Sequence, residues 1–93
     1  MAFFQPRKRI YTEPIELGSQ PRTWIAKHRG FASREWVESQ VQYGEWIPEN
    51  SEQQKFLIYA TVIDGIKPLT ILIKVKTFDT HALVYHVHVL RKK

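Results

Sequence analysis

Two histidines, His86 and His88, stand two residues apart in a β-rich stretch near the end of the sequence. Side chains at positions i and i+2 of a strand lie on one face, about 7 Å apart by strand rise. Imidazole exchanges protons near neutral pH, so such a pair can act as a general base and a general acid. Lys74 and Lys76, on the preceding β-rich stretch, would lower the histidine pKa and stabilise negative charge on a phosphate. The pattern favours metal-independent phosphodiester cleavage.

Further side chains are candidates for holding the substrate. Tyr59 has the chemistry to stack on a base or to orient a phosphate. Basic residues predicted to contact nucleic acid are Lys55, Lys76, Arg91, Arg29 and Lys27. We predict no metal site, because the histidine pair lacks a third ligand and the chain has no cysteine. No cofactor-binding motif is present in the sequence, so no cofactor is expected.

Three β-rich runs, residues 55–63, 68–77 and 82–91, must position these side chains. Asp64-Gly65 between the first two runs predicts a hairpin with a type I′ turn, which needs positive φ at both central positions. Residues 78–81 supply the second turn. Because the runs are connected sequentially, the simplest topology is an antiparallel meander.

Alternation along these strands predicts two faces of different character. If Ile63 pairs with Ile66, and if the second turn has three or five residues, one face is apolar and the other is half-polar and basic. The predicted core face holds Phe56, Ile58, Ala60, Val62, Ile71, Ile73, Val75, Leu83, Tyr85, Val87 and Val89. The opposite face holds Lys55, Leu57, Tyr59, Thr61, Thr70, Leu72, Lys74, Lys76, Val84, His86, His88 and Leu90.

Two short helices are expected before the meander. The first begins near Ser19, with Pro21 in its first turn, and stops at Gly30. The second begins at the N-cap Ser33 and ends at Gly44. We therefore predict an α+β fold, with two short N-terminal helices packed on one face of a three- to four-stranded antiparallel meander. Residues 1–18 are expected to be an arm, partly flexible or an edge strand, and residues 19–93 a single α+β domain.

The charge distribution is compatible with a polyanionic partner. The chain has 93 residues and a net charge of +5. Six Lys and Arg stand against two acidic residues in residues 1–31, one against five in 32–54, and seven against two in 55–93. A basic face suits polyanions, since phosphate neutralisation gives affinity without base recognition. The longest apolar run, residues 56–63, is too short to span a membrane, and no signal peptide is evident, so we predict a cytoplasmic protein without membrane contact.

The order of several motifs resembles that of a widespread family of small prokaryotic domains similar to the BrnT and RelE-type toxins. The likeness covers about residues 21–91 and is carried by Arg29-Gly30-Phe31, Val37 and Val41 at helical spacing, Gly44-Glu45-x-Ile47, and Asp64-Gly65-x-x-Pro68-Leu69. The resemblance implies two helices on one side of a curved antiparallel sheet. It also implies an endonuclease that cleaves mRNA without metal, using basic, Tyr and His side chains on the open face of that sheet.

The functional hypothesis is thus a RelE/BrnT-like toxin, or a degenerate relative, with His86 and His88 in acid–base roles beside Lys74 and Tyr59. Its expected partners are RNA and a small acidic antitoxin. One alternative is a non-catalytic module whose basic face binds nucleic acid or an acidic protein. A further alternative is a homodimer that buries this face, since the same residues can instead contact water on an open sheet face or form a dimer interface.

Overall fold

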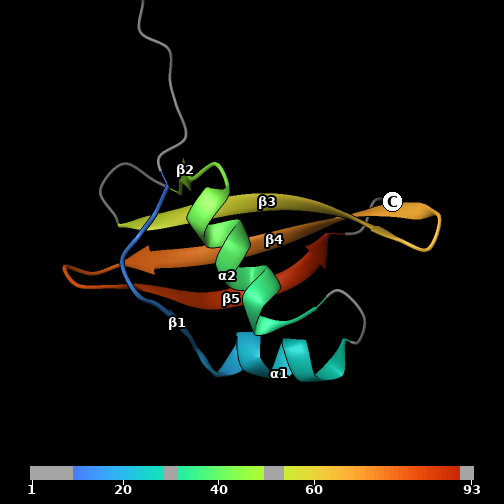
Figure 1. The fold of residues 1–93 in the computed structure, drawn as a ribbon, viewed down its shortest axis with the longest axis horizontal. Coiled ribbons are helices and arrows are strands. Elements are labelled where there is room, and N and C mark those ends of the chain that lie inside the picture. The colour runs from blue at the N-terminus through green and yellow to red at the C-terminus, as the bar shows by residue number, and fades with distance from the viewer. Residues whose placement is uncertain (1–9, 29–31, 50–53, 91–93) are drawn as a thin grey trace, which may run out of the picture.

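The computed structural model describes residues 10–28, 32–49 and 54–90. In these ranges the chain forms one five-stranded sheet and two helices (Figure 1). The strand order is β1-β5-β4-β3-β2, with β1 parallel to β5 and the other neighbours antiparallel. The elements are β1 (Ile15–Leu17), α1 (Ser19–Lys27), α2 (Arg34–Tyr43), β2 (Ile47–Pro48), β3 (Lys55–Asp64), β4 (Lys67–Thr77) and β5 (Ala82–Leu90).

The predicted fold class is wrong in its sheet and in the place of its helices. The sheet is mixed and has five strands, and both helices lie between β1 and β2 instead of preceding every strand. The added edge strand β1 is short, and its pairing with β5 is extended by a hydrogen bond of 2.8 Å from the Gly18 amide to the Val84 carbonyl. A strand of three residues is too short for alternation to reveal it in the sequence.

Local capping explains where α2 begins and ends. The Ser33 hydroxyl accepts a hydrogen bond of 3.0 Å from the Trp36 amide, as an N-cap should. Gly44 ends the helix, and a Cβ at this position would lie only 2.4 Å from the Gln40 carbonyl oxygen. The predicted cap residues of this helix are confirmed. Its buried residues, Val37 and Val41, face the sheet, and the helix crosses one sheet face in Figure 1.

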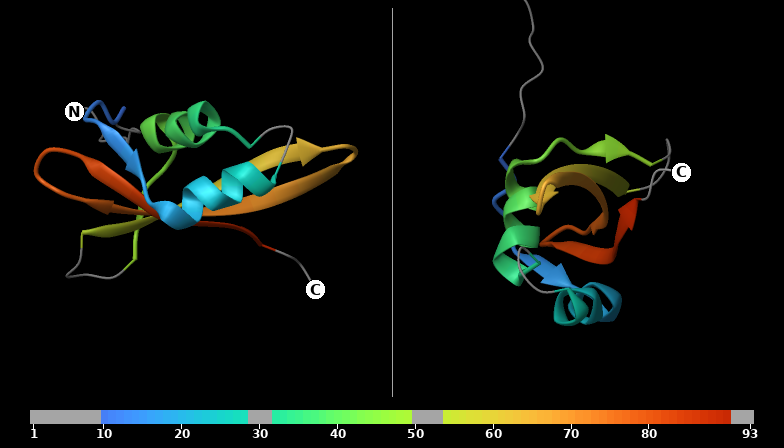
Figure 2. Two further views of the ribbon diagram at one scale, coloured as in Figure 1. Left: turned by 90° about the horizontal axis from the view of Figure 1, so that it is seen from below. Right: turned by 90° about the vertical axis from the view of Figure 1, so that its right-hand side faces the viewer.

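The other helix, α1, lies along the β5 edge of the sheet. The side-chain amide of Gln20 donates to the Val87 carbonyl oxygen and accepts from the Val87 amide, at 2.9 Å each. This amide satisfies backbone groups that a longer β1 would otherwise pair. Trp24, from the same helix, is buried in the core. Figure 2 shows α1 beside β5 and the β3–β4 hairpin extending past both helices.

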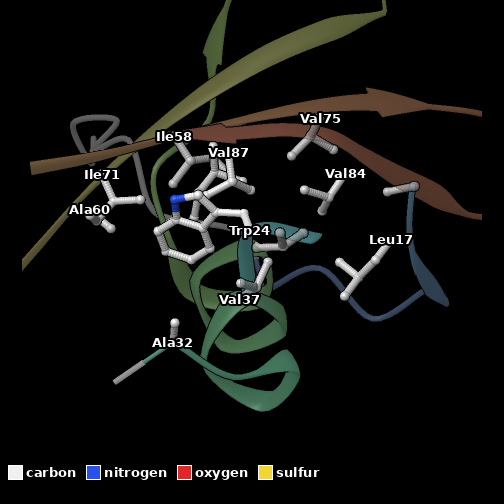
Figure 3. Packing of buried hydrophobic residues seen from close by; sticks show 13 residues of the cluster. Leu17, Trp24, Ala32, Val37, Ile58, Ala60, Ile71, Val75, Val84 and Val87 are labelled. Atoms are coloured by element: carbon white, nitrogen blue, oxygen red, sulfur yellow. The ribbon is translucent and has the colours of Figure 1, made fainter. Parts of the chain in front are cut away.

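The core lies between α2 and the sheet and is closed at one side by α1. Figure 3 shows the Trp24 ring among aliphatic side chains from the central strands and from α2. Each fully buried Val or Ile contributes roughly 1.5–3 kcal/mol of hydrophobic free energy. The buried residues of this cluster are Leu17, Trp24, Ala32, Val37, Val41, Ile58, Ala60, Ile71, Ile73, Val75, Ala82, Val84 and Val87.

The β3–β4 turn is displaced by one residue from its predicted position. Asp64 pairs with Lys67, so the two central residues are Gly65 and Ile66. Gly65 has φ 71°, and no other residue in the described ranges has positive φ. A glycine at the first central position is typical of a type II′ turn, so the predicted type I′ turn is wrong. The shift preserves the faces, because both pairings join an even-numbered residue with an odd-numbered one and each partner moves by two residues.

The β4–β5 pair contains an irregularity that changes one face assignment. Thr77 pairs with Ala82 across a four-residue loop, Val75 pairs with Val84, and the next pair is Lys74 with His86. Tyr85 is therefore the extra residue of a β-bulge. The buried residues before the bulge are Ala82 and Val84.

The predicted faces of Leu83, Val84 and Tyr85 are wrong for this reason. A loop with an even number of residues puts Val84 in the core and Leu83 on the opposite face. The extra residue then restores the predicted phase for His86 and His88. Bulges of this kind re-aim side chains, and here Tyr85 faces the same side as His86.

Candidate functional site

The sheet face turned away from α2 carries most of the candidate residues. We call it the open face, because no helix of the described ranges covers it (Figure 2). Its polar and charged members include Lys55, Tyr59, Lys74, Lys76, Tyr85, His86 and His88, and its apolar members include Leu57, Leu72 and Leu83.

Three of the predicted residues come together at the middle of the open face. Lys74 on β4 is directly opposite His86 on β5. The rings of His86 and His88 lie edge to face, with centroids 4.9 Å apart and planes inclined by 64°. Opposed cross-strand residues have Cβ atoms about 5 Å apart. One cation and two imidazoles therefore form a compact cluster, which we call the histidine cluster.

The two histidines differ in their surroundings. Burial, and then the neighbouring charges of His88 and Lys74, lower the pKa of His86. Neutral imidazole is the form that accepts a proton, so His86 is suited to act as a base. Nδ1 of His88 is buried and has no hydrogen-bond partner in the described part of the chain. Proton exchange at His88 is thus left to Nε2.

Tyr59 lies on the open face but not in the histidine cluster. It pairs with Leu72, which in turn pairs with His88, so one strand separates the tyrosine from the histidine. Two strand spacings amount to about 10 Å. Leu72, which lies between Tyr59 and His88, is buried, whereas Tyr59 is 50% exposed. The tyrosine is therefore placed to meet a ligand that extends across the sheet, and not the group held by the histidines.

A second feature of the open face is a shallow depression lined by Lys55, Lys76, Leu83 and Tyr85, with a volume of about 240 Å³. Lys55 and Lys76 are directly opposed across β3 and β4. The Lys55 ammonium lies 5.8 Å from the centroid of the Tyr85 ring. We call these four residues the lysine depression.

Glu49 lies at the rim of the lysine depression. The Tyr85 hydroxyl donates a hydrogen bond of 3.1 Å to its carboxylate. Burial, this hydrogen bond and the Glu49 charge together raise the pKa of Tyr85. Tyr85 is therefore a neutral hydrogen-bond donor at physiological pH.

Sequence reasoning missed Tyr85 and Glu49 as site residues. Tyr85 was predicted to face the core, and Glu49 was not among the predicted site residues. The sequence does contain a sign of the bulge. The small apolar residues of the last strand are Ala82, Val84, Val87 and Val89, and the step from Val84 to Val87 breaks the period of two.

The remaining candidates lie elsewhere. Lys27 is exposed in the last turn of α1, a helix that packs by Trp24 into the core side of the sheet. Arg29 and Arg91 lie outside the described residues. The described ranges contain no group of three His, Asp or Glu side chains that could hold a metal ion. In the same ranges no helix is long and apolar enough to cross a membrane.

Comparisons with protein-family models, with curated proteins and with solved structures give no match to this chain.

Proposed function

We propose that this protein is a metal-independent endoribonuclease and that the histidine cluster is its reaction centre. The observation that carries the proposal is the contact between His86 and His88, 4.9 Å apart between ring centroids, with Lys74 directly opposite His86. Two imidazoles in different environments can divide the roles of base and acid. An ammonium beside them stabilises the charge that develops on the phosphate.

The reaction that fits these groups uses the ribose 2′-hydroxyl of the substrate as nucleophile. His86 removes the hydroxyl proton, and the 2′-oxygen forms a bond to phosphorus. The bond from phosphorus to the 5′-oxygen breaks, and His88 returns a proton to that oxygen through Nε2. Lys74 contacts a non-bridging oxygen of the phosphate. The products are a 2′,3′-cyclic phosphate and a 5′-hydroxyl, so atoms and protons balance without a further reactant.

The proposed cellular role is that of a toxin held inactive by an acidic antitoxin, as the resemblance to the RelE and BrnT-type toxins implies. The charge of the open face supports it. Lys55, Lys74 and Lys76 make no salt bridge within the described part of the chain. An acidic segment laid across these lysines would neutralise them and cover the histidine cluster.

The activity is tested by incubating the purified protein with single-stranded RNA in the presence of EDTA. We expect fragments that end in a 2′,3′-cyclic phosphate, and no cleavage where a single 2′-deoxy nucleotide replaces the ribose. His86→Asn and His88→Asn should each lower the rate by about 10²–10⁴-fold, the range for one proton-transfer group.

His28→Asn is the matched control, because His28 lies at the C-terminal end of α1, outside the open face. It should cleave at the wild-type rate, whereas a contaminating nuclease would leave all the variants equally active. Equal cleavage by all three variants, or RNA binding without any cleavage by the wild-type protein, would overturn the proposal. The second outcome would leave a non-catalytic binding module.

A further inference from the structure

We propose that the lysine depression is a phosphate subsite, which holds the phosphate next to the one placed at the histidine cluster on a single-stranded polynucleotide. The inference rests on the proposed function only for the identity of the strand as RNA. It adds a second binding position and two residues, Tyr85 and Glu49, to which sequence reasoning gave no role in binding.

The two positive charges of the lysine depression favour the binding of an anion. Lys55 and Lys76 are directly opposed on neighbouring strands, and like charges in this arrangement destabilise a strand pair. Neither ammonium reaches a carboxylate at salt-bridge distance in the ranges that the structure describes. A phosphate between the two ammonium groups would remove this repulsion and accept a charge-assisted hydrogen bond from each.

Aromatic rings hold both lysines in position. The Lys55 ammonium lies over the Tyr85 ring, and the Lys76 ammonium lies 5.4 Å from the centroid of the Phe78 ring. The Phe78 ring is itself stacked on His81, with centroids 4.8 Å apart. Contacts of this kind contribute roughly 0.5–1 kcal/mol at exposed sites and restrict the side chain. The subsite is therefore partly organised before a ligand binds.

The spacing of the two positions fits a polynucleotide. Lys74 and Lys76 are two residues apart on β4 and face the same side, which separates them by about 7 Å. One nucleotide of an extended single strand spans such a distance between successive phosphates. A strand that runs along β4 would thus place one phosphate at Lys74 and the next between Lys76 and Lys55.

Substitution of Glu49 should change RNA affinity in the opposite direction to substitution of the lysines. Its carboxylate is held at the rim by the Tyr85 hydroxyl. Its negative charge repels an entering phosphate. Its hydrogen bond also takes up the proton of the Tyr85 hydroxyl. Replacing it with a neutral amide should strengthen binding, whereas loss of either lysine should weaken it.

The experiment measures binding of a fluorescent 2′-O-methyl RNA, which lacks the free 2′-hydroxyl and cannot be cleaved, by anisotropy at several salt concentrations. Lys55→Met and Lys76→Met should each weaken binding about tenfold, as expected for one charge-assisted contact. The slope of log K against log salt should become shallower by about 0.7, the value for one phosphate of a single strand. Glu49→Gln should bind more tightly than wild type.

Lys67→Met is the matched control, since it removes one positive charge from the exposed end of the β3–β4 hairpin. It should bind nearly as well as wild type and keep the salt slope. The inference is overturned if Lys55→Met and Lys76→Met behave like this control, or if Glu49→Gln weakens binding. Lysine-dependent binding by a protein that cleaves no RNA would support the subsite and contradict only the proposed activity.

Discussion

Lys74 on β4 lies directly opposite His86 on β5, and in the described ranges neither side chain forms a salt bridge. The pair combines a permanent cation with a titratable base at one position of the sheet. Burial and His88 act in the same direction as the lysine, and all three lower the pKa of His86. The lysine thus contributes to lowering the pKa of the imidazole and also attracts a phosphate, and both effects should be lost in a single substitution.

Lys74→Met should raise the pKa of His86, because the substitution removes a positive charge beside the imidazole and keeps most of the side-chain volume. The titration is followed by NMR through the Cε1 proton of each histidine. Lys67→Met is the matched control and should leave the His86 titration unchanged. In the cleavage assay, the acidic limb of the pH–rate profile should move to higher pH. An unchanged His86 titration in Lys74→Met would show that the lysine does not act on the imidazole.

Stability should also depend on pH through His86. Its pKa in the folded protein lies below the ordinary value of 6.5, so in the acidic range the unfolded chain binds more protons than the folded one. The contribution of His86 to stability is complete above pH 6.5 and is lost as the pH falls through the folded pKa. Urea unfolding at pH values on both sides of 6.5 should show a smaller acid loss for His86→Asn than for wild type. Parallel losses in the two proteins would contradict the assignment.

Local signals in the sequence were sufficient to predict several features of the structure. Ser33 caps the helix that directly follows it, and a Cβ at Gly44 would clash with the Gln40 carbonyl oxygen one turn earlier, so both signals are local. The Ile58 methyl, 2.9 Å from that Cβ, is a second close contact that the local sequence does not reveal. The shared face of Lys74, His86 and His88 was also predicted, although the loop length was not. The four-residue loop and the extra residue of the bulge together give the same parity as the predicted odd loop.

Features that depend on non-local contacts were not predicted. An edge strand was one of the expectations for residues 1–18, but the bounds of β1 and its parallel pairing are recognisable only from the β5 edge. Tyr85 faces the lysines because it is the extra residue of the bulge. The four-residue β4–β5 loop alone would turn Val87 and Val89 to the open face, and the extra residue returns them to the core face. Glu49 meets Tyr85 because the short β2 ends beside β3 at that point.

Deleting Tyr85 should leave a folded protein with a regular β4–β5 ladder. Without the bulged residue, Val84 would still pair with Val75 and His86 with Lys74, so every other side chain of β5 would keep its face. The circular dichroism spectrum and the cooperativity of unfolding should stay close to wild type. Binding of the uncleavable RNA should weaken, because the lysine depression loses one wall. Deletion of the adjacent Val84, which removes a fully buried side chain and places Tyr85 opposite Val75 on the core face, is the contrasting variant and should unfold the protein.

Gln20→Leu should destabilise the fold by about 1–3 kcal/mol, the cost of leaving partly buried hydrogen-bonding groups without partners. The amide of Gln20 satisfies both the N–H and the carbonyl of Val87 and thereby fixes α1 to the β5 edge. Leucine retains similar bulk but offers neither a donor nor an acceptor. Arg22→Ala, at an exposed position of the same helix, is the control and should change stability by no more than about 0.5 kcal/mol. Urea denaturation measures both variants. If they unfold at the same midpoint, the amide does not secure the helix, and packing of Trp24 alone holds α1 in place.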